Sequence, residues 1–180
     1  RDDLARVLMP DADPVALPVE DRAGIERGVD LPCILCYADR TLLPEPSALP
    51  CLTSPPVFSC FNRHAKMDDS FLRLCRAVLD RLPGSTAVFK FGGYPDELQV
   101  KMRRALGAER VSFPPTTPSI EHVEAYHGVD LALDPLVQNG GVTTMESLWM
   151  GVPAVTLPGR QTSNRTSASV LTVLSLTDFI

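Results

Sequence analysis

The feature that most constrains the fold is a regular alternation of strand-like and helix-like segments from residue 57 onward. Short runs rich in Val, Phe and Leu, typical of buried strands, are separated by segments whose apolar residues recur at helical spacing, such as Phe71, Leu74 and Val78. The expected strands are 57–61, 86–91, 111–113, 129–133 and 154–157, and helices are expected to start near 68, 95, 119, 142 and 163. This alternation predicts the α/β class, a Rossmann-like parallel sheet with helices on both faces.

Sheets of this class bind ligands beyond the carboxyl ends of their strands, in the loops that lead into the helices. Three such loops carry polar or charged residues, namely 62–66, 116–122 and 138–146. We therefore expect these three loops, which are distant in the sequence, to meet at one edge of the sheet.

The stretch 138–153 is the main candidate binding element. It begins as a glycine turn and continues as a short helix that stops at Gly151. Free N–H groups and the positive end of the helix dipole meet at such a start, which suits an anion such as a phosphate. The same pattern also fits a capped helix with nothing bound. The candidate ligand-binding residues here are Asn139, Gly140, Gly141, Val142, Thr143, Thr144 and Glu146.

Lys66 is the candidate catalytic residue. Lysines are few in this chain, and Lys66 follows Asn62 in the first of the three loops. A cation at this edge would balance a diphosphate and stabilise it as a leaving group. The alternative is an ordinary solvated loop lysine.

Two further residues are candidates for ligand contact. His122 lies in the first turn of the helix expected at 119–126, where it can face a base or a ribose, although a lone histidine is more often a surface or packing residue. Arg165 lies in the hydroxyl-rich loop 162–167, which either contacts phosphate or caps the next helix.

Composition and missing motifs exclude several classes of function. The net charge of -5 argues against a general nucleic-acid binder, and no apolar run approaches the ~20 residues of a membrane span. The sequence lacks the glycine fingerprints of NAD-binding domains and P-loop NTPases, the nucleophile elbow of hydrolases, and any His/Asp/Glu set with metal-ligand spacing. We therefore expect no metal and no cofactor.

The N-terminal third is expected to differ from the rest. A helix is predicted at 2–8 and a strand at 31–37, followed by the prolines Pro44, Pro46, Pro50, Pro55 and Pro56, which indicate an extended connector and a domain boundary near residue 50. The five cysteines are an odd number, and Cys33 and Cys36 lie in the apolar run 31–37. We interpret these two thiols as buried and structural, in a reducing, cytoplasmic compartment.

Four segments carry a family resemblance. They are FNRHAKM at 61–67, IEHV at 120–123, DLALD at 130–134 and NGGVTTMESLWMGVPAVTLPG at 139–159. In this order they resemble the O-GlcNAc transferase/SPINDLY family of glycosyltransferases, in its bacterial form linked to tetratricopeptide repeats (TPR). The resemblance runs from about residue 31 to residue 180.

The resemblance implies a GT-B fold, in which a nucleotide sugar binds between two Rossmann-like domains. Residues 51–180 would be the C-terminal, donor-binding domain, cut short at its C-terminus, and residues 1–50 a remnant of the N-terminal catalytic domain. The implied partners are a nucleotide-sugar donor, a protein acceptor, and upstream TPR and catalytic domains. By resemblance, Lys66 supports the diphosphate leaving group, His122 lies near the uridine, Glu146 holds the ribose hydroxyls, and 142–144 form the phosphate-binding helix start.

The implied activity is an inverting, metal-independent transfer of a sugar to Ser or Thr hydroxyls of proteins. Where some members of the family have His-Thr-Thr, this chain has Gly141-Val142-Thr143, and Ser119 replaces a lysine beside the uracil. These departures leave GDP-fucose open as a donor beside UDP-GlcNAc, which we favour. A GT-B-fold sugar-nucleotide epimerase and a non-catalytic nucleotide-binding module are the alternative functions. We expect the isolated fragment to bind a nucleotide but to turn over poorly.

Overall fold

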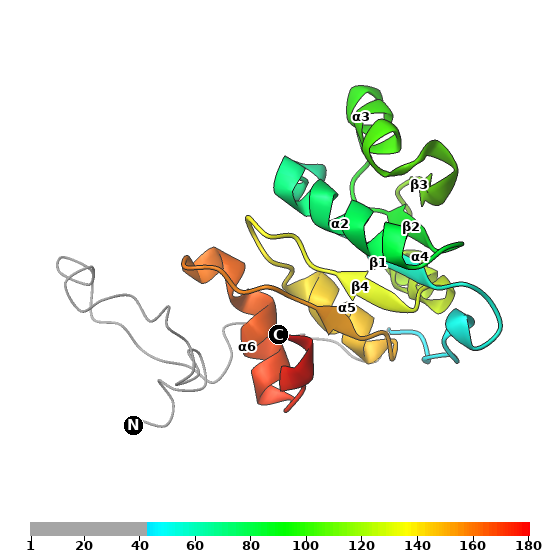
Figure 1. Cartoon of the computed structure of the whole chain (residues 1–180). Coiled ribbons are helices and arrows are strands. Elements are labelled where there is room, and N and C mark those ends of the chain that lie inside the picture. Colours follow the sequence, from blue (N-terminus) through cyan, green and yellow to red (C-terminus); the bar gives the residue numbers. More distant parts are fainter. Residues whose placement is uncertain (1–42) are drawn as a thin grey trace.

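The computed structural model describes residues 43–180, which form a parallel sheet flanked by helices (Figure 1). Five strands lie in the order β3-β2-β1-β4-β5, and every neighbouring pair is parallel. The strands are β1 (Val57–Cys60), β2 (Thr86–Phe89), β3 (Val111–Ser112), β4 (Leu131–Leu133) and β5 (Ala154–Val155). The predicted α/β class is confirmed, with strands somewhat shorter than the apolar runs that predicted them.

The helices follow the predicted alternation. They are α2 (Asp69–Arg81), α3 (Asp96–Leu106), α4 (Ser119–Glu124), α5 (Val142–Trp149) and α6 (Thr166–Val173), with short 3₁₀ turns η2 (Pro50–Leu52), η3 (His64–Lys66), η4 (Ala108–Arg110), η5 (Ala125–Gly128), η6 (Thr162–Asn164) and η7 (Thr177–Phe179). Asp68 caps α2 by accepting a hydrogen bond from the backbone N–H of Phe71 at 2.9 Å.

The helix expected near 119 begins at Ser119, and Pro118 precedes it without a side-chain cap. One helix start needs correction. The last helix begins at Thr166 rather than near 163, because the turn η6 occupies the residues before it.

Each face of the sheet has its own apolar core. On one face, Phe58 and Phe89 pack with the buried side of α2 and α3, including Phe71 and Met102. The opposite face carries a second cluster at α4, η5 and the end of α5, formed by Phe61, Val123, Tyr126, Val129, Met150 and Val152. Successive residues of a strand point to opposite faces, so this division confirms that helices cover both sides.

The strand order changes direction between β1 and β4. The chain moves outward from β1 to β3 and then returns to the other side of β1 for β4 and β5. The loops after β1 and β4 therefore run to opposite faces and leave an opening between them, the usual ligand position in an open parallel sheet. These are two of the three loops that the sequence predicted.

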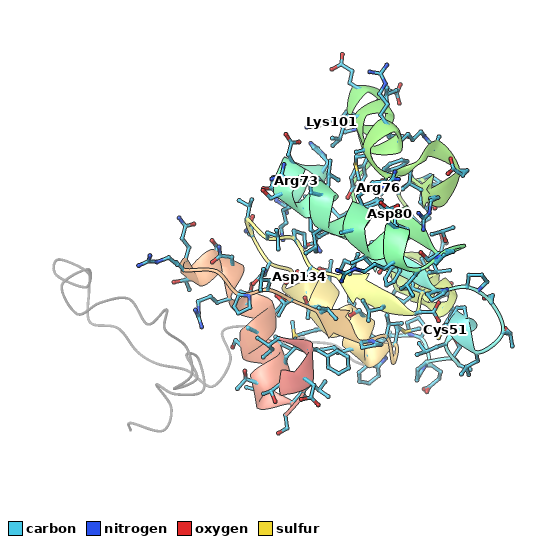
Figure 2. All side chains as sticks on the ribbon, viewed as in Figure 1. Cys51, Arg73, Arg76, Asp80, Lys101 and Asp134 are labelled. Atoms are coloured by element: carbon cyan, nitrogen blue, oxygen red, sulfur yellow. The ribbon has the colours of Figure 1, made fainter. Side chains whose placement is uncertain are left out.

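Charged side chains separate into exposed and buried groups (Figure 2). Arg76 and Asp80 pair on the exposed surface of α2, and Lys101 of α3 pairs with Asp69 at 2.6 Å in the same solvent-facing region. Asp134, at the end of β4, is only 6% exposed. The outer pairs contribute little to stability, while the buried carboxylate lies at the ligand edge.

The proline-rich connector is attached to the sheet through Asp130. The two carboxylate oxygens of Asp130 accept the backbone N–H groups of Cys51 at 2.6 Å and Val57 at 2.8 Å. The helix predicted at 2–8, the strand at 31–37 and Cys33 and Cys36 lie outside the described residues. Within residues 43–180, none of the helices is long and apolar enough to cross a membrane.

Candidate functional site

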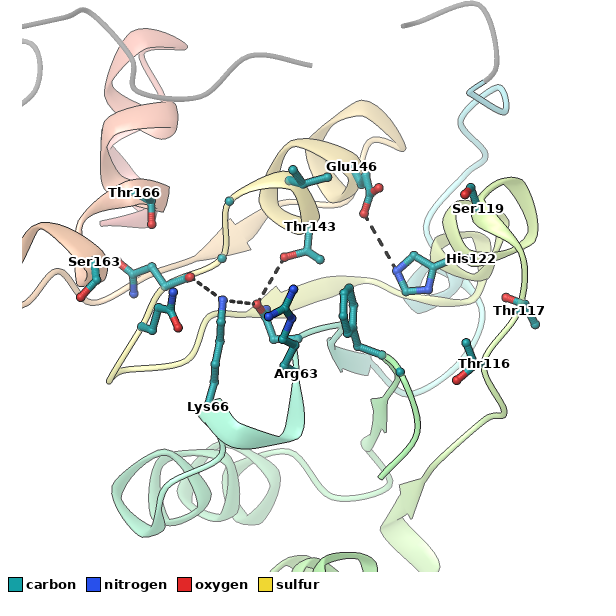
Figure 3. Close-up of a pocket in the computed structure, with 18 residues that line it drawn as sticks. Arg63, Lys66, Thr116, Thr117, Ser119, His122, Thr143, Glu146, Ser163 and Thr166 are labelled. Carbon is teal, nitrogen blue, oxygen red and sulfur yellow. Dashed lines mark hydrogen bonds and ion pairs between the residues drawn. The ribbon is translucent and has the colours of Figure 1, made fainter. Parts of the chain in front are cut away.

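A cavity of about 780 Å³ opens at the carboxyl edge of the sheet (Figure 3). All three predicted loops contribute to its wall, so the structure brings together segments that are distant in the sequence. The lining residues are Asn62, Arg63, Lys66, Phe91, Gly92, Thr116, Thr117, Ser119, His122, Gln138, Asn139, Gly140, Gly141, Val142, Thr143, Glu146, Ser163 and Thr166.

Lys66 is held at the centre of this wall by two hydrogen bonds. Its ammonium donates to the side-chain oxygen of Asn62 at 2.9 Å and to the backbone oxygen of Asn139 at 2.7 Å (Figure 3). An ammonium has three protons, so one remains for a ligand. Partial burial lowers the pKa of Lys66, and the nearby carboxylate of Asp134 opposes that shift. Lys66 thus joins the loop after β1 to the loop after β4.

The helix α5 presents its N-terminus to the same cavity. Gly141 is its N-cap residue, and no side chain of the described chain caps it. The first turn of a helix leaves N–H groups without backbone partners, and the dipole makes this end positive. The backbone around Val142 and Thr143 is therefore suited to an anion such as a phosphate.

Close packing fixes the loop that precedes α5. The backbone N–H of Gly140 donates to the carboxylate of Asp134 at 2.5 Å, and Thr156 donates its hydroxyl to the other oxygen of that carboxylate at 2.7 Å. A Cβ on Gly140 would lie 2.4 Å from the hydroxyl oxygen of Thr144. Glycine is therefore required here by lack of space. Burial raises the pKa of Asp134, and its hydrogen bonds oppose the rise.

The two threonines of the first turn point in different directions. The Thr143 hydroxyl lies 3.5 Å from the side-chain oxygen of Asn62 and lines the cavity. Thr144 is buried, and its hydroxyl lies 2.8 Å from that of Ser167 in α6. Thr144, one of the predicted ligand contacts, therefore does not line the cavity. Its hydroxyl instead joins α5 to α6. Asn139 is buried beneath the loop, and its amide donates to Pro135 at 2.9 Å.

His122 and Glu146 face each other at the far end of the cavity (Figure 3). The His122 Nε2 atom lies 4.0 Å from a carboxylate oxygen of Glu146. Phe61 and Phe91 contact the imidazole ring, with centroid distances of 5.4 and 5.9 Å. Burial, followed by the positive charge of Lys90, lowers the pKa of His122 to about 4. The imidazole is therefore neutral near pH 7.

Arg165 lies outside this cavity wall. Its guanidinium is buried and donates to the backbone oxygen of Gly159 at 3.1 Å. The arginine thus closes the loop between β5 and α6, whereas Ser163 and Thr166 of the same region line the cavity.

Sequence reasoning missed several residues of the site. Lys90 and Asp134 directly follow β2 and β4, and a charged residue at the end of an apolar strand was the available signal for both. Arg63 was also missed, and its guanidinium lies 5.9 Å from the centroid of Phe91. Within residues 43–180 there is no group of His, Cys, Asp and Glu side chains that could hold a metal ion.

Comparison with known proteins decides the family. The model of glycosyl transferase family 41 matches residues 48–180, which include the whole sheet and every residue that lines the cavity. The chain belongs to glycosyl transferase family 41. The resemblance seen in the four sequence motifs is therefore confirmed, and the cavity described above is the candidate donor site of a family 41 domain.

Individual relatives agree with this assignment. The protein named "Probable UDP-N-acetylglucosamine--peptide N-acetylglucosaminyltransferase SPINDLY" of Arabidopsis thaliana is 31% identical over 179 residues, which are 92% of this chain and 19% of the relative. The UDP-N-acetylglucosamine--peptide N-acetylglucosaminyltransferase of Caenorhabditis elegans is 30% identical over 127 residues, or 69% of this chain and 11% of the relative. The matched part of the chain thus spans less than a fifth of the Arabidopsis protein and about a tenth of the Caenorhabditis protein.

A solved structure supports the fold. An O-GlcNAc transferase mutant from Thermobaculum terrenum is similar at a TM-score of 0.66 and 32% identity, covering 69% of this chain and 25% of that one. The family 41 sheet and its helices are thus shared with a solved transferase.

Proposed function

We propose that this chain is the donor-binding domain of a glycosyltransferase that moves a sugar from a nucleotide diphosphate to a protein hydroxyl. One observation carries the proposal. The uncapped N-terminus of α5 and the ammonium of Lys66 face one cavity. Lys66 lies in the loop after β1 and α5 follows β4, the two strands between which the strand order changes direction. Two positive groups that face the same cavity suit a diphosphate.

These two groups also define the chemistry. As the bond between the sugar and the diphosphate breaks, negative charge grows on the leaving phosphate. Fixed donors aimed at growing charge stabilise the transition state most effectively. Lys66 and the N–H groups near Val142 and Thr143 would supply that stabilisation. By resemblance to the family, the proposed transfer proceeds with inversion and without a metal.

The donor and acceptor are assigned by similarity. Both relatives described above carry UDP-N-acetylglucosamine and peptide in their names, which favours UDP-GlcNAc over GDP-fucose and a protein as acceptor. A Ser or Thr hydroxyl as the accepting group is proposed from the family resemblance alone. Glu146 and His122 would contact the nucleoside. TPR and N-terminal catalytic domains are the proposed partners. Cys51, Cys60 and Cys75 are free, which fits a cytoplasmic location.

Calorimetric titration of UDP and GDP into the chain tests the donor site. We expect UDP to bind, and Lys66→Met to weaken binding about tenfold or more, because it removes one charged hydrogen bond to phosphate. Lys101→Met is the matched control, since Lys101 pairs with Asp69 on the surface and should leave binding unchanged. Absence of heat with both nucleotides in a folded sample would contradict the proposal.

A further inference from the structure

Lys90 is a buried lysine just behind the cavity wall. It follows β2, is only 3% exposed, and does not line the cavity itself. Its ammonium donates to the hydroxyl of Thr117 at 2.5 Å and lies 3.3 Å from the Nδ1 atom of His122. In the described chain, no carboxylate pairs with this ammonium. Burying an ammonium is costly, so these two polar contacts are important for holding it.

The contact with His122 determines where the imidazole carries its proton. A protonated lysine only donates hydrogen bonds, so Nδ1 must be the acceptor. A neutral imidazole with an acceptor at Nδ1 carries its proton at Nε2. The ammonium of Lys90 therefore selects the Nε2–H tautomer of His122.

The selected proton faces the candidate donor site. The Nε2 atom is buried and has no hydrogen-bond partner among residues 43–180. It lies toward Glu146, and both side chains line the cavity with Thr117 (Figure 3). The rings of Phe61 and Phe91 contact the imidazole. A fixed, unpaired N–H in a confined place is suited to an oxygen of the nucleoside, from either the ribose or the base.

We propose that Lys90 is a positioning residue that holds His122 as the Nε2–H tautomer, so that His122 donates a hydrogen bond to an oxygen of the bound nucleoside. The inference rests on the proposed function, because it names what one part of that nucleotide site does. Lys90 itself would touch no ligand, but it would determine which ring nitrogen of His122 offers a hydrogen bond to the ligand.

The charges around His122 determine its pH dependence. Lys90 follows β2, Glu146 lies on α5, Arg63 lines the same cavity, and Glu121 neighbours His122 on α4. Burial and Lys90 together lower the pKa of His122 to about 4, so the imidazole stays neutral above about pH 5. Removing the charge of Lys90 should raise that pKa, but burial should keep it below the ordinary value of about 6.5.

The test uses NMR of the chain labelled with ¹⁵N in its three histidines, recorded as a function of pH. Long-range ¹⁵N–¹H correlations report the tautomer of each ring, and His122→Gln assigns the His122 signals. Two variants separate charge from hydrogen bonding. Lys90→Met removes both, whereas Lys90→Gln removes the charge and keeps an N–H donor for Nδ1. The affinity of each variant for UDP and GDP is measured by calorimetry.

We expect Nε2–H in the native chain and in Lys90→Gln, and a mixture of tautomers in Lys90→Met. The pH midpoint of the His122 titration should rise in both variants. Nucleotide affinity should fall about tenfold in Lys90→Met alone. An Nδ1–H tautomer in the native chain overturns the inference, even if neither variant folds. A folded Lys90→Met that keeps the tautomer and midpoint also overturns it. If the native chain binds neither nucleotide, the proposed function fails instead, whatever the tautomer.

Discussion

Gly140 shows how one residue controls the candidate site. Its N–H is bound by the buried carboxylate of Asp134, and the hydroxyls of Thr143 and Thr144 lie on either side of the place where a Cβ would be. A side chain here would force these three side chains or the loop to shift, which we expect to disturb the start of α5. We therefore expect the site to be sensitive to an added methyl group at Gly140.

Replacing Gly140 with Ala should destabilise the chain by about 1–3 kcal/mol, the usual effect of overpacking, and weaken nucleotide binding. The new Cβ would lie 2.4 Å from the Thr144 hydroxyl oxygen and 3.0 Å from the Asp134 carboxylate. Urea unfolding and calorimetry measure the two effects.

Gly128→Ala is the control for this change, since a Cβ at Gly128 meets nothing within 4 Å. It should alter neither stability nor binding by a comparable amount. Equal behaviour of the two variants would show that close packing at Gly140 does not shape the site.

Single residues also show which parts of the candidate site could be predicted from the sequence and which could not. Lys66 was predictable because a rare lysine stands in a strand-to-helix loop. Lys90 was missed because it lies within the predicted strand 86–91, and binding residues were expected only in the loops that follow strands. Thr143 and Thr144 look equivalent in the sequence, but neighbouring helix residues differ by about 100° in direction. Only one of them faces the cavity, and the packing of α6 determines which.

Among the elements, the loops were predicted better than the ends of helices and strands. The alternation indicated which loops share an edge, because parallel strands all end on the same side. The start of α6 was predicted near 163, whereas the helix begins at Thr166 because the turn η6 occupies the residues before it. The order β3-β2-β1-β4-β5 could not be derived from alternation alone, since it depends on which strands pair.

The connector before β1 is an element whose attachment can be tested. Asp130→Ala leaves the backbone N–H groups of Cys51 and Val57 without their acceptors. We expect a loss of about 2 kcal/mol or more in the free energy of unfolding. Hydrogen exchange at those two amides should become faster.

Asp178→Ala is a suitable control for this loss, because Asp178 is exposed in the 3₁₀ turn η7. Its effect should stay within about 0.5 kcal/mol. If Asp130→Ala were equally mild, the connector would not depend on this carboxylate.

At the scale of the whole molecule, residues 43–180 supply one parallel sheet and the cavity proposed to bind the donor. The matched family 41 relatives are much longer, and the chain covers 19% of the Arabidopsis protein. Within the part that the structure describes, the charged groups at the cavity are those that suit the nucleotide, and we assign no base for the acceptor hydroxyl. Donor binding and sugar transfer should therefore be separable.

We expect the 180-residue chain to bind UDP while transferring no measurable sugar to a protein acceptor. Transfer of a radiolabelled sugar from UDP-GlcNAc, and in parallel from GDP-fucose, is the measurement. The reference is a longer family 41 transferase assayed beside it. Multiple turnovers by the 180-residue chain would show that it carries the complete active site.

The central claim is that a nucleotide diphosphate binds between the loop after β1 and the N-terminus of α5. Amide NMR spectra of the chain recorded during addition of UDP, with GDP as the second ligand, test it most directly. We expect the largest shift changes at Lys66, at 140–143 and at His122, and no change in α2 and α3. Shift changes confined to other surfaces, or none at saturating concentrations of both nucleotides, would contradict it.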